Sequence, residues 1–215
     1  MTKLTQQKAE SVVDHLLLGI ADLDQGIDWV RSTTGVEALK SGSHPGAGTR
    51  NALLSLGIRQ YMEIIAIDPQ QTETSRTADL IRQLRAPQLI TWAAATNDIV
   101  SMAEMARQAG CGIEGPIDGS RVKPDGHTLR WKTLRILSEC GDVIPFFIQW
   151  DTGIVHPSED SPSGCRLVTL EIRHPKADRL QEILASLGIV ATIHSGTTPK
   201  LETVIDTPAG IVRIS

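Results

Sequence analysis

Two polar residues inside apolar runs are the best candidates for chemistry. His15 lies in the segment SVVDHLLLG and Glu63 in the segment YMEIIAI. Side chains alternate between the two faces of a strand, so Glu63 would share an apolar face with Tyr61 and Ile65. Burying a carboxylate there is costly unless it is paired, protonated or bound to a metal. Glu63 is therefore either a functional residue or a structural one, which lies at a strand edge or pairs with an arginine such as Arg50.

A polar, glycine-rich loop over residues 41–51, SGSHPGAGTRN, supplies further candidates. Arg50 and Asn51 form a donor-rich pair at the entry to a strand, and a guanidinium binds a carboxylate or phosphate through two parallel hydrogen bonds. The pair is therefore a candidate contact for an anionic ligand group. His44, which precedes a proline, is either a turn residue or a contact to metal or substrate.

The second half of the chain adds aromatic and basic candidates. Arg130 would share one strand face with Lys132, and Trp131 would lie on the other face. If Arg130 points to a ligand it adds a second anion contact, and if it points outward it is a solvated edge charge. The large aromatic residues either line an apolar pocket or belong to the core: Trp92, Trp131, Phe147 and Trp150. His127 and His156, in a turn and a linker, are expected at the surface.

The elements that would hold these residues follow a repeated β-α-β-β-β order. The first unit covers residues 11–68, with a helix that ends at Gly35. The order recurs over residues 88–151 and again over 165–215. Units at spacings of roughly 75 residues indicate an internal repeat. The first two are joined over residues 68–87 by a polar connector with one short helix.

The composition narrows the class of protein. The chain has 215 residues, of which 40% are hydrophobic and 21% charged, with a net charge of −4, which is ordinary for a globular protein. It contains no block of basic residues, which argues against nucleic-acid binding. No apolar run approaches the ~20 residues that span a bilayer, which argues against a membrane partner. Three cysteines without a CxxC pair, and a first segment without an apolar leader, favour free thiols and a cytoplasmic location.

Two long segments resemble a known family. VVDHLLLGIADLDQGIDWVRSTTGV and HPGAGTRNALLSLGIRQYMEIIAIDP are similar to the first module of glyoxalase-like members of the vicinal oxygen chelate superfamily, the glyoxalase, bleomycin resistance and extradiol dioxygenase group. IPFFIQWD, HPSEDSPSGCRL and the third unit resemble the longer glyoxalase-like proteins. The resemblance implies an α+β fold. Modules 11–68 and 88–151 would form one domain, 11–151, as a half-open mixed β-barrel with helices outside, and 165–215 would be a third, C-terminal module.

The resemblance also implies a metal site in the concave face of the barrel. In that superfamily the ligands of a divalent metal usually come from the first and last strands of each module, and His15 and Glu63 match these positions in the first module. They would bind zinc, iron, manganese, nickel or cobalt. The metal would act on a chelated, oxygenated substrate in lyase, isomerase or dioxygenase chemistry.

The second module departs from this pattern. It has Thr91 and Trp92 where a histidine is expected, and Gln149 among phenylalanines where a glutamate is expected. Gln149 or His44 would have to complete the site, because stable metal sites normally have three or four ligands. Two functions therefore stay open: a metal-dependent enzyme acting on a small, oxygenated, anionic molecule, and a metal-free protein that binds or sequesters such a molecule. The unmatched sheet edge of the third module predicts a homodimer.

Overall fold

The first module forms one half of a curled sheet in the computed structural model, which describes residues 7–122, 126 and 128–215. Helix α2 begins where the side chain of Asp22 accepts a hydrogen bond from the Gln25 N–H, and it ends at Gly35, whose positive φ of 78° suits a glycine. The elements of this module are β2 (Val13–Gly19), α2 (Leu23–Thr34), β3 (Leu39–His44), β4 (Thr49–Gly57) and β5 (Gln60–Ile67).

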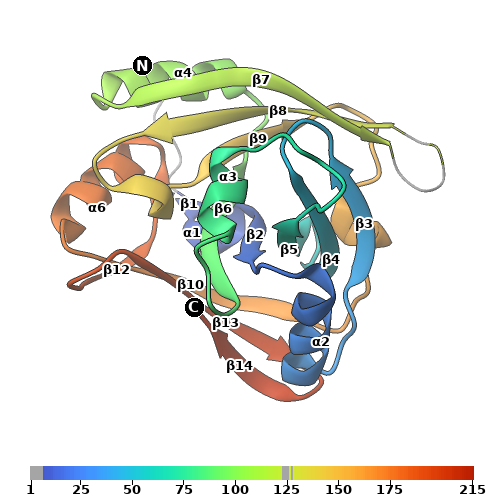
Figure 1. The fold of residues 1–215 in the computed structure, drawn as a ribbon. Coiled ribbons are helices and arrows are strands. Elements are labelled where there is room, and N and C mark those ends of the chain that lie inside the picture. The colour runs from blue at the N-terminus through green and yellow to red at the C-terminus, as the bar shows by residue number, and fades with distance from the viewer. Residues whose placement is uncertain (1–6, 123–125, 127) are drawn as a thin grey trace.

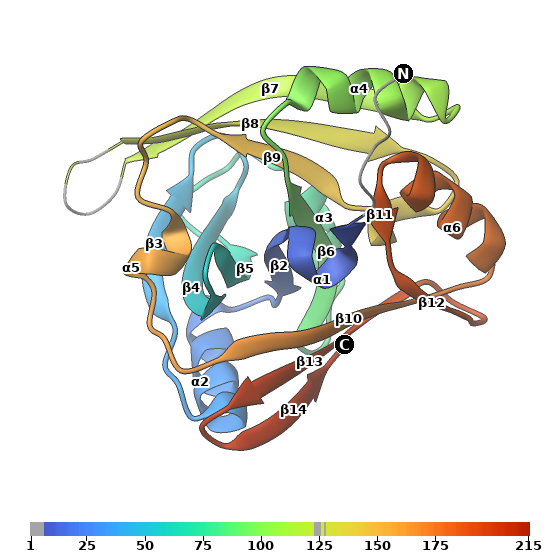
Figure 2. The same cartoon turned by 180° about the vertical axis from the view of Figure 1, so that it is seen from behind.

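The second module repeats this order and completes the sheet. Its elements are β6 (Gln88–Ala95), α4 (Ile99–Gln108), β7 (Gly112–Val122), β8 (Thr128–Leu137), a 3₁₀ turn (Gly141–Val143) and β9 (Phe146–Trp150). Antiparallel pairing of β2 with β6 joins the modules into one mixed sheet of order β3-β4-β5-β2-β6-β9-β8-β7. The sheet curls into a half-barrel with α2 and α4 outside (Figures 1 and 2). The expected α+β half-barrel is confirmed.

The connector between the modules lies on the concave side of the sheet. Its helix α3 (Arg76–Ile81) begins at Ser75, whose hydroxyl accepts a hydrogen bond from the Ala78 N–H. Ile81 packs with Leu17 and Ile90 in a small apolar cluster inside the barrel. The connector is therefore part of the wall of the concave side, which Figure 1 shows in front of the sheet.

The C-terminal unit has the expected order of elements but a different strand order. Its four-stranded sheet has the order β12-β10-β13-β14, so its first strand, β10, lies between β12 and β13. In the two barrel modules, by contrast, the first strand pairs with the last strand of the same module, β2 with β5 and β6 with β9. The C-terminal unit is therefore not a third copy of the barrel module. The remaining elements are β1 (Gln7–Lys8), α1 (Ala9–Val12), α5 (Pro157–Asp160), β10 (Arg166–His174), α6 (Ala177–Ser186), β11 (Ile189–Val190), β12 (Thr192–Ser195), β13 (Lys200–Thr207) and β14 (Gly210–Ile214).

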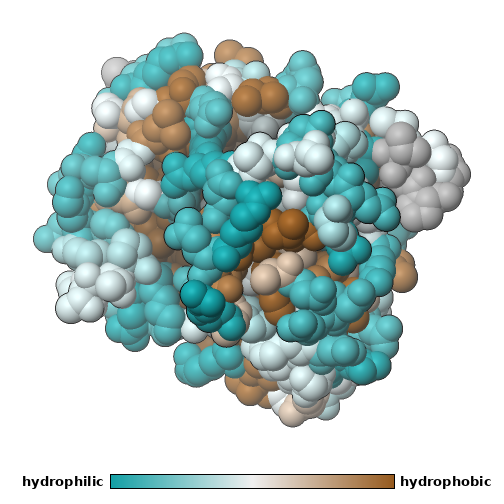
Figure 3. Space-filling view, viewed as in Figure 1, coloured by the Kyte–Doolittle hydropathy of each residue, from teal (hydrophilic) through white to brown (hydrophobic). Residues whose placement is uncertain are grey.

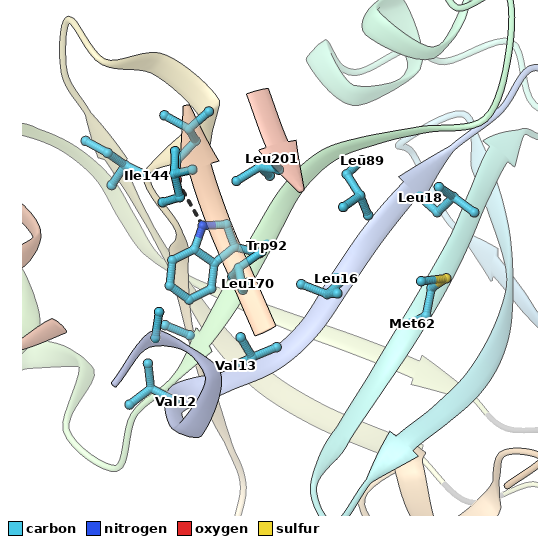
Figure 4. Close-up of a cluster of buried hydrophobic side chains, with 14 of the residues drawn as sticks. Val12, Val13, Leu16, Leu18, Met62, Leu89, Trp92, Ile144, Leu170 and Leu201 are labelled. Atoms are coloured by element: carbon cyan, nitrogen blue, oxygen red, sulfur yellow. Dashed lines mark hydrogen bonds between the residues drawn. The ribbon is translucent and has the colours of Figure 1, made fainter. Parts of the chain in front are cut away.

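The C-terminal sheet covers the convex face of the barrel. Leu16 and Trp92 of the barrel share one buried cluster with Leu170 and Leu201 of that sheet (Figure 4). The Trp92 indole N–H also donates to the carbonyl of Val143 at 2.9 Å. Each fully buried leucine contributes about 1.5–3 kcal/mol, so this shared core couples the two parts. Strands β12 and β14 remain edges of the C-terminal sheet, and the homodimer stays a prediction.

The face of the molecule that carries the connector is mixed in character. Figure 3 shows a group of apolar residues near its centre, next to hydrophilic ones. Among the described residues, no helix has both the length and the apolar character needed to cross a membrane.

Candidate functional site

A cavity of about 530 Å³ fills the concave side of the half-barrel. Both modules and the connector line it, and its volume is in the range of small-molecule sites. Most of its wall is apolar, and its larger apolar side chains include Leu17, Ile65, Ile90, Trp131, Phe146 and Trp150. The rings of Trp131 and Trp150 lie 5.4 Å apart between centroids, with 60° between their planes, so one side of the cavity is an aromatic wall.

One end of the cavity is polar and centres on Glu63. The parallel pairing of β2 with β5 places His15 beside Glu63, with His15 Nε2 3.6 Å from Glu63 Oε2. This separation is too long for a hydrogen bond, so both atoms remain available to a ligand. Asn51 Nδ2 donates to the other carboxylate oxygen, Oε1, at 2.7 Å. The structure thus brings together three of the residues singled out in the sequence, and all three line the cavity.

His44 joins this cluster from the end of β3. Its Nε2 lies 3.2 Å from Asn51 Nδ2 and its Nδ1 2.9 Å from Thr49 Oγ1. Because the Asn51 amide donates, Nε2 is the acceptor, and Nδ1–H donates to the threonine hydroxyl. Burial lowers the pKa of His44 below its ordinary value, with the Glu63 carboxylate opposing and the Arg121 guanidinium adding to that shift. His44 is therefore neutral near pH 7, and its Nε2 lone pair is engaged.

Asp14 fixes the orientation of His15. The two residues are neighbours, and His15 Nδ1 lies 2.8 Å from Asp14 Oδ1. A carboxylate accepts there, so Nδ1 carries the proton and Nε2 points to Glu63. Burial alone would raise the pKa of Asp14, but the hydrogen bonds from His15 and His156 outweigh it and hold that pKa well below its ordinary value. Asp14 is therefore ionised.

Tyr61 supports the same imidazole from one side. Its ring stacks on that of His15 with 4.6 Å between centroids and 18° between planes. Burial raises the pKa of Tyr61 well above its ordinary value, and the nearby Asp14 and Glu63 carboxylates add to the shift. The phenol therefore stays neutral. The edge of Phe146 contacts His15 as well, at 5.5 Å between centroids.

Arg121 brings a buried cation to the polar end from the second module. It is 9% exposed, lies on β7, hydrogen-bonds to the Ser41 hydroxyl and has Nη1 3.5 Å from Asn51 Oδ1. These contacts also hold the two edge strands, β3 and β7, near each other. Sequence reasoning missed Arg121, since the glycines and proline of GIEGPIDGSRV obscure a strand eleven residues long. The alternation of faces along β7 becomes a useful signal only once that strand is known.

The other expected site residues lie outside the cavity wall. Arg50 follows Thr49 and precedes Asn51 on β4, so it points to the opposite face, and its buried Nε has no hydrogen-bond partner. Arg130 is exposed, and Trp131 takes the concave face of β8. Gln149 accepts a hydrogen bond from the Ile99 N–H at 2.8 Å, at the start of α4. Trp92 belongs to the convex core described above.

The expected surface position of His156 is wrong. Its side chain is fully buried at 0% exposure, and its Nε2 lies 3.1 Å from Asp14 Oδ2. The linker folds back through α5 against the barrel, where the Ser55 N–H donates to the carbonyl of Pro162. A contact between residues so far apart in the chain leaves no local signal. His127 lies outside the described residues.

At the opposite end of the cavity, ionic groups from the connector and the second module meet. Asp142 accepts hydrogen bonds from Arg76 at 2.6 Å and from Arg135 at 2.9 Å. Arg76 belongs to α3 and Arg135 to β8, so the two ion pairs of Asp142 connect the connector to the barrel. The cavity therefore has a buried polar end, an apolar middle and a more exposed ionic rim.

The side chains at the polar end do not fit the metal site that the resemblance implies. His15 and Glu63 would be two ligands, but the Nε2 of His44 already accepts from Asn51. The second module presents Phe146 and Ile148 to the cavity from β9. Within residues 7–122, 126 and 128–215, no group of three or more His, Cys, Asp or Glu residues is arranged to hold a metal ion. Stable sites normally need three or four ligands.

Comparisons with known proteins agree with the fold. The sequence profile of the glyoxalase-like domain matches residues 13–188. The crystal structure of a hypothetical protein from Staphylococcus aureus matches with a TM-score of 0.71 at 16% identity, over 94% of this chain and 98% of that one. Methylmalonyl-CoA epimerase from Mycobacterium tuberculosis matches with a TM-score of 0.49 at 22% identity, over 69% and 91%. The likeness to the Staphylococcus aureus protein concerns the fold alone. Among curated proteins no sequence gives a significant match.

Proposed function

Because the chain belongs to the glyoxalase-like domain family of the vicinal oxygen chelate superfamily, we propose that it binds a small oxygenated anion and moves a proton on it. The ligand would have an apolar body. Its anionic end would lie at the polar end of the cavity, and its body along the aromatic wall. His15 and Glu63 would be the acid–base pair. The reaction class is an isomerisation or elimination that begins by removing a proton next to a carbonyl.

The observation that carries this proposal is the pair of facing atoms, His15 Nε2 and Glu63 Oε2, at 3.6 Å. Asp14 accepts a hydrogen bond from His15 Nδ1–H, so the lone pair of Nε2 is directed at the ligand space. Glu63 Oε1 is engaged by Asn51, which leaves Oε2 as the free carboxylate oxygen. Both atoms can accept a proton from the same position of the ligand. One of the two groups can therefore remove a proton from the ligand, and the other, in its protonated form, can donate a proton back.

The charge that develops in such a reaction has a partner nearby. Removal of the proton leaves its electron pair on the ligand, as an enolate whose negative charge lies on oxygen. The guanidinium of Arg121 lies beside Asn51 at the same end of the cavity. Preorganised donors in a site that excludes water stabilise such charge more strongly than the same donors in water. Arg121 therefore supports both binding of the anion and the reaction.

No step of this proposal passes through a metal. A divalent metal in this position would supply electrophilic chemistry on two chelated oxygens, but among the described residues the polar end offers two free ligands, His15 and Glu63. The resemblance to the superfamily supports the position of the site, and the side chains support acid–base chemistry within it.

The test is deuterium incorporation. Protein is incubated in D₂O with a panel of 2-oxo and 2-aryl carboxylates, and loss of the C–H signal is followed by proton NMR. We expect exchange with at least one member, reduced by about 10²–10⁴-fold in His15→Ala and Glu63→Gln, the usual contribution of a general acid or base. The variant Arg130→Gln, at an exposed position outside the cavity, serves as the control. Exchange that persists in both cavity variants would refute the assignment.

A second candidate function is binding without turnover. The volume of the cavity and its tryptophan wall favour it, since these features suit stacking of an apolar molecule. It predicts that chelator-treated protein binds an aromatic anion, detected by quenching of Trp131 and Trp150, while no member of the panel exchanges a proton. Measurable exchange that depends on Glu63 would exclude it.

A further inference from the structure

We infer that His156, in the linker to the C-terminal unit, is a positioning residue for His15 and acts through Asp14. The inference rests on the proposed function only for its effect on rate, because its geometric claim concerns a hydrogen-bond chain that exists without ligand. The chain runs from the linker through Asp14 to the imidazole of His15.

The tautomer of His156 follows from its own contacts. The backbone N–H of Ser158 donates to His156 Nδ1 at 3.2 Å. Nδ1 is therefore an acceptor, and the ring proton is on Nε2. That proton is donated to Asp14 Oδ2 at 3.1 Å. The backbone N–H of His156 is bonded to Glu159 at 3.2 Å, which fixes the start of the turn that carries the ring.

The carboxylate of Asp14 has its two oxygens assigned to different partners. Oδ2 accepts from His156 and also from the indole N–H of Trp150 at 2.8 Å. Oδ1 accepts from His15 Nδ1 at 2.8 Å. Asp14 and His156 are each at 0% exposure, so bulk water does not compete for either oxygen. Two donors on Oδ2 stop the carboxylate from rotating and leave Oδ1 in place for His15.

This arrangement gives the linker a role in the site. Residues 11–151 supply His15, Glu63, Asn51 and Arg121, but one of the two donors to Asp14 Oδ2, His156, comes from beyond that range. The rings of Tyr61 and Trp150 each pack edge-on against His156, at 5.6 Å and 5.5 Å between centroids. His156 thus contacts Tyr61, which stacks on His15, and Trp150, which also donates to Asp14 Oδ2.

The first measurement is the tautomeric state of His15, read from imidazole nitrogen shifts in ¹⁵N-labelled protein. We expect the Nδ1–H form in wild type. In His156→Phe, which keeps a ring but loses the donor, we expect a mixture with the Nε2–H form. In His156→Gln, whose amide N–H₂ can donate to Asp14, we expect the wild-type state to return. A merely structural role would not produce this pattern of loss and rescue.

The second measurement is deuterium exchange on the same proteins. His156→Phe should lower the rate by on the order of 10- to 100-fold, the range for partners that orient a functional histidine, and His156→Gln should restore most of it. Trp150→Phe removes only one donor from Oδ2 and is the second variant if His156→Phe does not fold. It should shift the His15 tautomer in the same direction.

The two hypotheses fail in different ways. An unchanged His15 tautomer in folded His156→Phe and Trp150→Phe would overturn the positioning role, even if wild type exchanges protons. Absence of exchange in wild type would overturn the proposed function, while the tautomer measurement would still decide the role of His156.

Discussion

His15 Nε2 and Glu63 Oε2 face each other at 3.6 Å across the polar end of an otherwise apolar cavity. The hydrogen bonds made by the other polar atoms of these two side chains leave the pair open. Asp14 accepts a hydrogen bond from His15 Nδ1–H, and Asn51 donates one to the second oxygen of Glu63. The resemblance implies metal ligands at these two positions, yet the surroundings of His15 and Glu63 favour the proton transfer that we propose.

Arg121 is expected to determine the preference for anions. Replacing it with glutamine removes a charged donor, whose hydrogen bonds contribute about 1.5–3 kcal/mol, so the affinity for an anion should fall by about tenfold or more. The probe is anilinonaphthalene sulfonate, and its uncharged analogue N-phenylnaphthylamine should bind equally well to wild type and variant. Arg130→Gln should change neither affinity. Equal losses for both probes would mean that Arg121 shapes the cavity and does not recognise charge.

Asp14 is expected to make the fold sensitive to acid. Its pKa in the folded protein lies below the ordinary value of 3.8, so its ionised form contributes stability that is fully present above the ordinary value and is lost as the pH falls towards the folded one. Asp14→Asn should lower the free energy of unfolding at pH 7 by about 3 kcal/mol, as for a broken buried pair. The gap to wild type should narrow below about pH 4, in urea titrations at several pH values.

The matched control for Asp14 is Asp24, which is exposed and pairs with Lys40. Asp24→Asn should change stability little, since exposed ion pairs contribute little. A gap for Asp14→Asn that stays constant down to pH 2 would contradict the assigned role of its charge.

Gly48 is expected to hold the loop that presents His44. It has a φ of +67°, and an added Cβ would lie 2.2 Å from the carbonyl oxygen of Glu73. Gly46 has a similar φ of +75° but open space around it. Alanine at either position pays about 1–2 kcal/mol for the left-handed backbone, so the difference between the two variants isolates the clash. Gly48→Ala should be the less stable in thermal unfolding and should weaken anion binding. Equal stability of the two variants would contradict this account.

The sequence predicts much of the first module because the signals there are local. Alternation along a single strand places Glu63 on the ligand face. The same rule separates Arg50 from Asn51, since adjacent residues on β4 must face opposite ways. Arg50 and Asn51 therefore cannot both contact the ligand, although the sequence predicts that both do so. The short loop between β3 and β4 brings His44 to Asn51 within a few residues of chain.

The rest of the site depends on tertiary contacts that leave no local pattern. Arg121, on edge strand β7, contacts Asn51 on β4. His156, in the linker that follows both modules in the chain, contacts Asp14 near the start of the first module. The repeat of element order also conceals a difference: β10 occupies a position in its sheet that β2 and β6 do not. Order along the chain does not determine order in a sheet, so this difference becomes evident only in three dimensions.

The most direct test of the central claim combines deuterium exchange with elemental analysis on one sample of chelator-treated protein. We predict that exchange persists at the wild-type rate when metal is far below one ion per chain, and that Glu63→Gln lowers it by about 10²–10⁴-fold. Exchange that disappears with the metal and returns when zinc, iron, manganese, nickel or cobalt is added would contradict the account. His15 and Glu63 would then be metal ligands.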